Sequence, residues 1–306
     1  MAHVETVSGP VEGKDLGFTL SHEHVAMQPA FVTTHYPWMV NRDKIRNRAI
    51  RELTEAKQGG VDTIIELSTP DLQRDVELIQ EVAQASGMQV VVATGLWRDI
   101  PRYFWSRTPE QIADIFVHEI EEGIGNTTIK AGAIKVANDA EGVTPEAELV
   151  LRGAAQACKR TGTPISTHHW APLEVGRRQV ELFQEEGAPM DRICIGHSAD
   201  STDADYLEDL LKTGVYLSMD RYPGSGDRPN WQQRNATVKE LIDRGWANKI
   251  MVGHDYAPGL IPEESPTRYL FLITTALPAL HADGVDENTI REMTHEVPRR
   301  FLTGED

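Results

Sequence analysis

Short apolar runs alternate with longer segments of helical periodicity over most of the chain. Eight of these runs are rich in β-branched residues and bounded by turn-forming residues, so we expect them to be strands. They cover residues 17–22, 61–67, 88–94, 131–137, 163–168, 192–197, 214–219 and 249–253. Helices are expected between and after them, over residues 42–58, 71–86, 109–122, 145–160, 173–186, 203–212, 236–244 and 266–302.

Regular alternation of strand and helix predicts parallel strands joined by crossover helices. Glycine follows most of the expected helices within a residue or two, as at Gly59, Gly87 and Gly162, which fits the left-handed turn that ends a helix. The G-x-G-x-x-G fingerprint of a dinucleotide-binding sheet is absent. The expected fold class is therefore α/β, a (β/α)₈ TIM barrel that forms a single domain over residues 1–306.

The charge balance limits the partners of the protein. The chain has 30 basic and 47 acidic residues and a formal net charge of −17, and a field of this sign repels nucleic acid and anionic membrane surfaces. No apolar run is long enough to span a membrane, and no signal peptide is recognisable at the start. Cys158 and Cys194 lie in apolar stretches and are expected to be free, buried thiols. We expect a cytoplasmic protein that binds neither nucleic acid nor membranes.

Two histidines stand at the end of the first expected strand, in the run Ser21-His22-Glu23-His24. Alternate residues of a strand point to the same side, so His22 and His24 can converge on one point while Glu23 faces away. Two imidazoles at this spacing suit a metal ion, although the pattern alone is weak.

Three further expected strands carry metal-ligand residue types at their carboxyl ends, namely His168, His197 and Asp255. These ends meet on one face of a barrel, where barrel enzymes build their active sites. One histidine there is more often structural, but several on different strands predict a metal site. His169 and His254 should face away from it, and the remaining histidines are given no role.

Lys135 lies within the apolar run of the fourth expected strand, where a charged amine is costly to bury. One interpretation is a lysine paired with a carboxylate at the mouth of the barrel. The other is an amine that has reacted with carbon dioxide, because the resulting carbamate is anionic and its two oxygens can bridge two cations. The sequence does not decide between them.

In this order, His22-x-His24, Lys135, His168, His197 and Asp255 resemble the ligand set of the phosphotriesterase family of the amidohydrolase superfamily, which includes phosphotriesterase-like lactonases. The similarity extends over nearly the whole chain. Other matching motifs are Leu20-Ser21-His22-Glu23-His24-Val25, Ala93-Thr94-Gly95-Leu96-Trp97, Gly132-Ala133-Ile134-Lys135, Ile195-Gly196-His197-Ser198 and Met219-Asp220-Arg221.

The resemblance implies two divalent metal ions, zinc first, with cobalt, manganese or iron as alternatives. One ion would bind His22, His24 and Asp255, and the other His168 and His197. A carbamate on Lys135, derived from CO₂, would bridge them together with a hydroxide. The pKa of the bridging water would fall toward about 7, and Asp255 would take its proton, so that Lys135 and Asp255 are both expected to be catalytic.

The resemblance also marks two substrate-binding positions, and they conflict. Trp97 occupies a place where organophosphate-hydrolysing members carry tryptophan and lactonases usually carry tyrosine, whereas Arg221 resembles an arginine of the lactonase-like members. Trp97 could also be an aromatic lid over the core, and Arg221 a solvated charge. The segment 256–267 is shorter than the loop that forms the acyl-chain channel in lactonases, which argues against long-chain substrates.

The expected activity is hydrolysis of lactones or related carboxylic esters, with phosphotriester cleavage as a side activity. A dedicated phosphotriesterase, an amidase or peptidase, and a non-catalytic metal-stabilised binding protein remain alternatives. The expected partner is a small-molecule ester, lactone or organophosphate. A homodimer is possible, and the aromatic loop 36–39 could serve either a dimer contact or the rim of the pocket.

Overall fold

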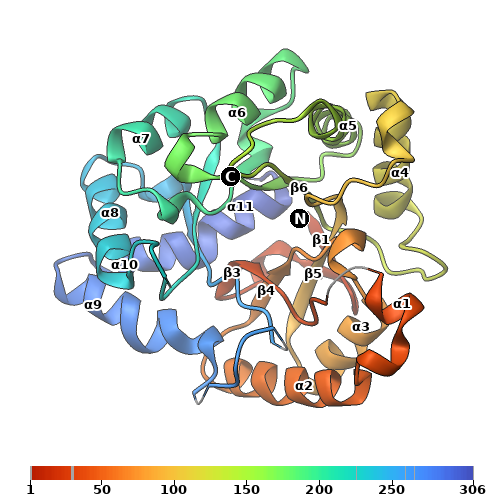
Figure 1. The fold of residues 1–306 in the computed structure, drawn as a ribbon. Coiled ribbons are helices and arrows are strands. Elements are labelled where there is room, and N and C mark those ends of the chain that lie inside the picture. Colours follow the sequence, from red (N-terminus) through yellow and green to blue (C-terminus); the bar gives the residue numbers. More distant parts are fainter. Residues whose placement is uncertain (1, 29–30, 225, 259, 265, 306) are drawn as a thin grey trace.

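A barrel of eight parallel strands forms the centre of the protein (Figure 1). The computed structural model describes residues 2–28, 31–224, 226–258, 260–264 and 266–305. Each expected strand is present: β3 Thr19–Glu23, β4 Thr63–Glu66, β5 Gln89–Gly95, β6 Ala133–Ala137, β7 Ile165–His168, β8 Ile193–Ile195, β9 Tyr216–Met219 and β10 Ile250–Val252. Neighbouring strands pair in the order in which they occur in the chain, and every pair is parallel.

The barrel closes where its last strand meets its first. No ladder joins β10 to β3, but Asp255 N donates to His22 O at 2.9 Å and His24 N donates to Tyr256 O at 3.0 Å. These bonds connect the segment after β10 to the end of β3, and we call residues 22–24 and 253–256 the seam. The predicted TIM barrel is confirmed.

Helices surround the barrel on the outside, as Figure 1 shows. The main ones are α2 Arg42–Gln58, α3 Val76–Ser86, α4 Pro109–Glu121, α5 Pro145–Thr161, α6 Gly176–Glu185, α7 Ala204–Lys212 and α8 Trp231–Asp243. The expected helix 266–302 is divided into a π-helix at Leu272–Ala276, α9 Leu277–Ala282, α10 Glu287–Arg291 and a second π-helix at Glu292–Glu296, and α11 Val297–Thr303 extends one residue beyond it.

Three of the other expected helices begin three or more residues away from the expected position, for local reasons. The helix expected from residue 71 begins at Val76, because Gln73 has a left-handed backbone (φ 58°) and Asp75 caps the helix by accepting from Leu78 N. The helix expected from 173 begins at Gly176, after Glu174 at φ 52°. The helix expected from 236 begins at Trp231, because Asn230 and Gln233 form a reciprocal capping box.

A short hairpin at the start of the chain was not expected. Its strands, β1 His3–Thr6 and β2 Gly9–Glu12, pair antiparallel. Val4 from this hairpin and Phe301 from α11 belong to the same buried cluster as the inward-facing Ile65 and Met251 of the barrel. The hairpin and α11 thus fill one end of the barrel, while the candidate site lies at the carboxyl ends of the strands. The helix α1, Val32–His35, lies in the 28–40 loop, of which residues 29 and 30 are outside the described residues.

Both cysteines are buried free thiols, as expected. Among the described residues, no helix is both long and apolar enough to cross a membrane.

Gly95 ends β5 at a position that no other residue can occupy comfortably. Its φ is +114°, and a Cβ atom there would lie 1.9 Å from the backbone oxygen of Lys135. We expect Gly95→Ala to lower the free energy of unfolding by roughly 3 kcal/mol or more, because backbone atoms would have to move. Gly87→Ala is the control, since Gly87 (φ +72°) has open space around it and should cost only about 1 kcal/mol. Urea denaturation compares the two variants, and equal losses would contradict the steric argument.

Candidate metal and active site

The structure brings all the predicted ligand residues together at the carboxyl ends of the strands. His22 Nε2 lies 2.9 Å from Lys135 Nζ, and His24 Nε2 lies 3.1 Å from Asp255 Oδ1. His197 Nε2 lies 2.9 Å from His168 Nδ1. The two groups adjoin, because the rings of His22 and His197 stack with centroids 4.5 Å apart. Side chains from five strand ends therefore converge on one small, buried volume.

Two sets of side chains in this volume could hold a metal ion. His22, His24 and Asp255 have ligand atoms that all lie within 4.8 Å of one another, and the same holds for His22, His197 and Asp220. We favour the first set, because the Asp220 carboxylate already accepts hydrogen bonds from His197 N and from Ser218 Oγ. Asp220 is thus better placed to orient imidazoles than to bind an ion.

Three residues of the site have left-handed backbone conformations, which are uncommon outside glycine. They are His197 (φ 62°), Arg221 (φ 66°) and Asp255 (φ 51°). Each stands two or three residues after the end of a strand, where the chain turns. Such strain persists only where surrounding contacts hold it, and it is concentrated at functional sites.

Asp220, at the end of β9, lies behind two of the imidazoles. Its Oδ1 accepts from His197 Nδ1 at 2.8 Å, and its Oδ2 lies 3.0 Å from His22 Nδ1. Burial raises the pKa of this carboxyl, but the nearby His22 and Arg221 outweigh that effect and hold the pKa well below its ordinary range. A buried carboxylate on one ring nitrogen leaves the other nitrogen directed toward the centre of the site.

Other buried groups support His24 and His168 in the same way. Ser68 Oγ lies 2.9 Å from His24 Nδ1 and donates to Glu66 Oε1 at 2.5 Å. Asp139 Oδ2 lies 3.3 Å from His168 Nε2. Every histidine of the site therefore has an acidic residue, directly or through Ser68, on the side away from the centre.

Burial keeps the imidazoles of His22, His168 and His197 neutral, as metal binding requires. It lowers the pKa of His22 and of His168 to about 4 in each case, and it lowers that of His197 well below 6.5. A neutral imidazole has a lone pair available for a cation.

Lys135 lies in the middle of the site without a matching acid. Among the described residues, Nζ contacts His22 Nε2 and, at 3.4 Å, the carbonyl oxygen of Thr167, and no carboxylate forms an ion pair with it. Burial lowers the pKa of this amine to about 8, although Asp255 and Asp220 partly oppose the shift. A simple lysine–carboxylate pair, the first of the two interpretations, is therefore not what the structure contains. A buried amine with a lowered pKa, imidazole neighbours and no carboxylate partner fits a residue that becomes anionic by carboxylation.

Arg221 is held by two carboxylates. Its Nε donates to Asp255 Oδ2 at 2.9 Å and its Nη1 to Asp200 Oδ2 at 2.6 Å. The fully buried Arg234 donates to the other oxygen of Asp200 at 2.7 Å. Burial raises the pKa of Asp255, but His197 and Arg221 hold it well below the ordinary value, so this carboxylate stays charged.

Trp97 lies beside His168, which in turn contacts His197. Its Nε1 is 3.4 Å from His168 Nδ1, and its ring meets the His168 ring edge to face at 5.8 Å. The Arg98 guanidinium lies over the indole ring, 5.3 Å from its centroid. The indole thus forms part of the wall next to His168.

Several residues of the site were not predicted from the sequence: Glu66, Ser68, Asp139, Asp200, Asp220 as a supporting carboxylate, and Arg234. Asp139, Asp200 and Asp220 share a signal that could have revealed them, since each stands within five residues after a strand. Arg234 carries no such signal, because it lies inside α8 and reaches the site only through the fold.

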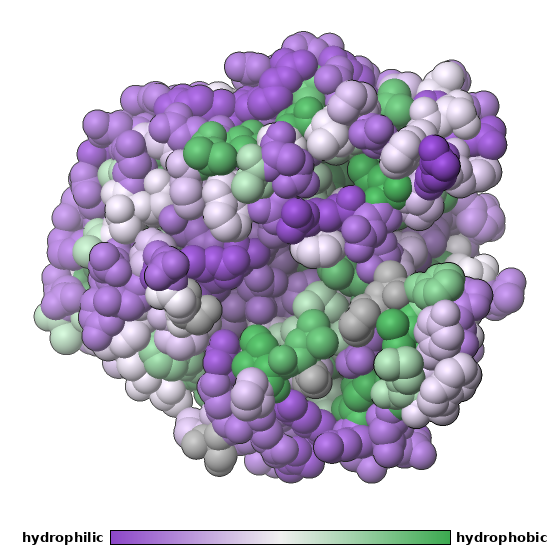
Figure 2. Space-filling model, viewed as in Figure 1, coloured by the Kyte–Doolittle hydropathy of each residue, from purple (hydrophilic) through white to green (hydrophobic). Residues whose placement is uncertain are grey.

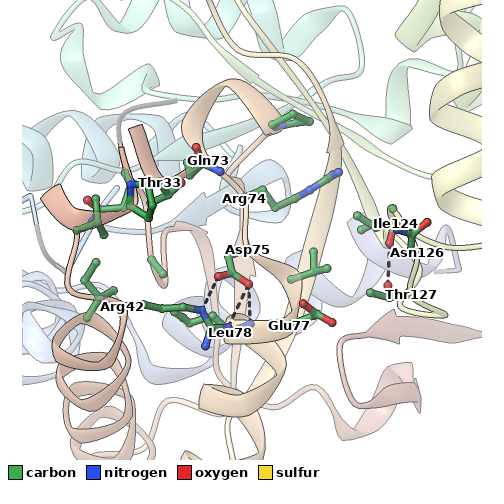
Figure 3. Close-up of a pocket in the computed structure, with 18 of the residues that line it drawn as sticks. Thr33, Arg42, Gln73, Arg74, Asp75, Glu77, Leu78, Ile124, Asn126 and Thr127 are labelled. Atoms are coloured by element: carbon green, nitrogen blue, oxygen red, sulfur yellow. Dashed lines mark hydrogen bonds and ion pairs between the residues drawn. The ribbon is translucent and has the colours of Figure 1, made fainter. Parts of the chain in front are cut away.

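A separate cavity of about 640 Å³ lies between α2, α3 and the 124–127 turn (Figure 3). Its walls include Thr33, Arg42, Asp75 and Asn126, and none of the predicted site residues lines it. Pro37 lines this cavity, so the aromatic loop borders it, and the side chain of Trp38 is 77% exposed. In Figure 2 hydrophilic residues line the hollow near the centre of the face shown, with hydrophobic residues along its lower rim.

Comparisons with known proteins agree with this geometry. The model of the phosphotriesterase family matches residues 2–302. The phosphotriesterase homology protein of Mycobacterium tuberculosis is 41% identical, over 99% of this chain and 98% of that protein. The aryldialkylphosphatase of Saccharolobus solfataricus is 36% identical, over 96% of this chain and 97% of that protein. The solved structure of the phosphotriesterase from Mycobacterium tuberculosis superimposes with a TM-score of 0.92 at 40% identity, covering 98% of each chain. Sequence motifs, barrel and histidine cluster together show that this chain belongs to the phosphotriesterase family, whose members are hydrolases with binuclear metal centres.

Proposed function

We propose that the protein is a binuclear-metal hydrolase of lactones or related carboxylic esters that also cleaves phosphotriesters at a lower rate. The observation that carries the proposal is the convergence of buried imidazoles, a buried lysine without a carboxylate partner among the described residues, and a charged aspartate at the strand ends. A hydrolase needs this combination of donors to hold two cations, whereas a structural site would need only a closed set of ligands around one.

His22, His24 and Asp255 would hold one ion, His168 and His197 the other, and carboxylated Lys135 both. When bound, divalent cations polarise a carbonyl or phosphoryl oxygen and lower the pKa of water toward about 7. The donor set fits zinc best, because imidazole nitrogens and carboxylate oxygens are its usual ligands.

Asp255 is the residue we propose to accept the proton of the attacking water. Its side chain is 20% exposed, so the carboxylate reaches solvent at the mouth of the barrel. Arg221 fixes its Oδ2 and leaves Oδ1 toward the histidines. The role of Arg221 is thus first to orient Asp255, and its influence on substrate choice follows from where it places that carboxylate.

Trp97 is proposed to form one wall of the substrate pocket, next to His168. The indole presents a flat apolar surface to an acyl or aryl group, and its N–H is occupied by the histidine. The apolar part of a lactone and an aryl leaving group both suit such a surface, so a dedicated phosphotriesterase remains the second candidate.

The test is kcat/KM at neutral pH, with zinc or cobalt and bicarbonate added, for a lactone series beside an aryl dialkyl phosphate. We expect lactones to be preferred by several orders of magnitude. A preference for the phosphotriester would make the dedicated phosphotriesterase correct. Background rates on every ester and amide, with two metal ions bound, would instead indicate a metal-stabilised binding protein.

A further inference from the structure

Glu23, the last residue of β3, lies between His22 and His24 in the chain and faces away from them. It is fully buried, and its carboxylate accepts three hydrogen bonds, all from the segment after β10. Oε1 accepts from His254 N at 2.7 Å and from His254 Nδ1 at 2.8 Å, and Oε2 accepts from Tyr256 N at 3.1 Å. A buried carboxylate with this many donors is a strong, directional contact.

The two backbone amides that Glu23 binds flank Asp255 on either side. Asp255 itself has a left-handed backbone at φ 51°, and its own N–H donates to His22 O at 2.9 Å. Three successive amides, those of residues 254–256, are therefore fixed by residues 22 and 23. An aspartate favours this conformation only weakly by itself, so these bonds select it.

The contact lies at the seam of the barrel, where the ladder between strands is missing. Elsewhere in the barrel, neighbouring strands are held by ladders of backbone bonds, but β10 and β3 are the two ends of the strand order. The Glu23 carboxylate accepts from the backbone N–H groups of His254 and Tyr256, in place of the carbonyl oxygens that a neighbouring strand would have offered. It therefore sets the position of the segment that carries Asp255 relative to His22 and His24.

His254 is fixed on its other side as well. Its Nε2 accepts from Leu272 N, the first residue of the π-helix, at 3.2 Å, so Nδ1 must carry the proton that it donates to Glu23. The ring is fully buried and points away from the histidine cluster, as expected from its place next to Asp255.

We propose that Glu23 is a positioning residue, whose carboxylate holds residues 254–256 so that Asp255 faces His22 and His24. The inference rests on the proposed function only in the statement that Asp255 binds metal. The holding of the backbone can be tested without metal and without substrate.

Hydrogen–deuterium exchange on the wild-type protein is the first measurement. We expect the amides of His254 and Tyr256 to exchange as slowly as that of Val252 in β10, because both are bound to a buried carboxylate. Exchange of these two amides at the rate of the exposed loops would overturn the proposal. Because the experiment uses the wild-type protein, it does not depend on whether a variant folds.

Glu23→Gln is the matching substitution, since glutamine keeps the shape but presents an NH₂ group where an acceptor is needed. We expect these amides to exchange about tenfold faster in E23Q. Glu119→Gln is the control, because Glu119 is a partly buried acid of α4 bonded to the buried Arg74 and not to the seam. It should lower stability without changing exchange at residues 254–256.

The third measurement is zinc retention in the presence of a chelator. It tests whether the contact of Glu23 with residues 254–256 affects the metal site. We expect E23Q to bind one of its two zinc ions roughly 10–100-fold more weakly, the effect usual for a partner behind a ligand, and E119Q to match the wild type. Wild-type retention of both ions in E23Q would overturn the positioning role. If the wild type itself holds no zinc, the proposed function fails, while the exchange experiment still decides whether Glu23 holds the segment.

Discussion

Replacing Lys135 by alanine is expected to abolish turnover and to leave the barrel folded. Lys135 is fully buried, contacts His22 Nε2 at 2.9 Å and has no carboxylate partner among the described residues. Removing an amine that no carboxylate pairs with leaves no broken ion pair, so the barrel should still fold, although the cavity left by this buried side chain should lower the free energy of unfolding by roughly 2–5 kcal/mol. If the carbamate bridges two ions, kcat should fall by more than about 10³-fold, beyond the effect of an outer partner.

The measurement is kcat together with zinc per chain for Lys135→Ala. We expect fewer than two zinc ions to be retained and no response to added bicarbonate. In the wild type, metal-free protein reconstituted with zinc should regain activity faster when bicarbonate is present. Near-normal turnover of the alanine variant would rule out the bridging role, whatever the metal content.

Asp255→Asn is expected to lower kcat by about 10³-fold or more, because an amide neither accepts a proton at neutral pH nor brings negative charge to a cation. The substitution also replaces the charged acceptor of Arg221 Nε, which is 2.9 Å from Asp255 Oδ2, by a neutral amide. The buried guanidinium of Arg221 then has Asp200 as its charged partner but no longer Asp255. We expect this loss to lower the free energy of unfolding by a modest amount.

Asp200→Asn separates the two effects. It disturbs the same arginine, and also Arg234, but leaves Asp255 in place. We expect Asp200→Asn to lower the free energy of unfolding at least as much as Asp255→Asn and to reduce kcat far less. Comparable loss of kcat in both variants would show that Asp255 acts only by holding Arg221.

Most of the barrel could be predicted from the sequence, because each strand is a short apolar run and each is followed by a helix with clear end signals. The hairpin His3–Glu12 escaped prediction, since its residues alternate weakly and its burial comes from packing against the end of the barrel. The start of α8 was missed by five residues, although Asn230 and Gln233 form a recognisable capping box. The split of 266–302 into π-helical turns depends on tertiary contacts, such as that of Leu272 N with His254.

The ligand residues could be predicted because they are histidines and one aspartate at strand ends. Their supporting carboxylates were harder to recognise, because acidic residues after strands are common and only the closed barrel shows which imidazole each one meets. Glu66 reaches His24 through Ser68, a connection between two strands that no spacing within the chain predicts. The partners of Arg221 are likewise visible only in three dimensions.

Asp220 contacts a histidine from each half of the site, His197 at 2.8 Å and His22 at 3.0 Å. This shared carboxylate makes the two halves inseparable in laboratory evolution, since any substitution at Asp220 alters both at once. Variation that changes substrate range is left to residues such as Trp97, which touches one imidazole from a loop. A library built to broaden the activity should therefore randomise the loops at the mouth of the barrel and keep the acids behind the histidines constant.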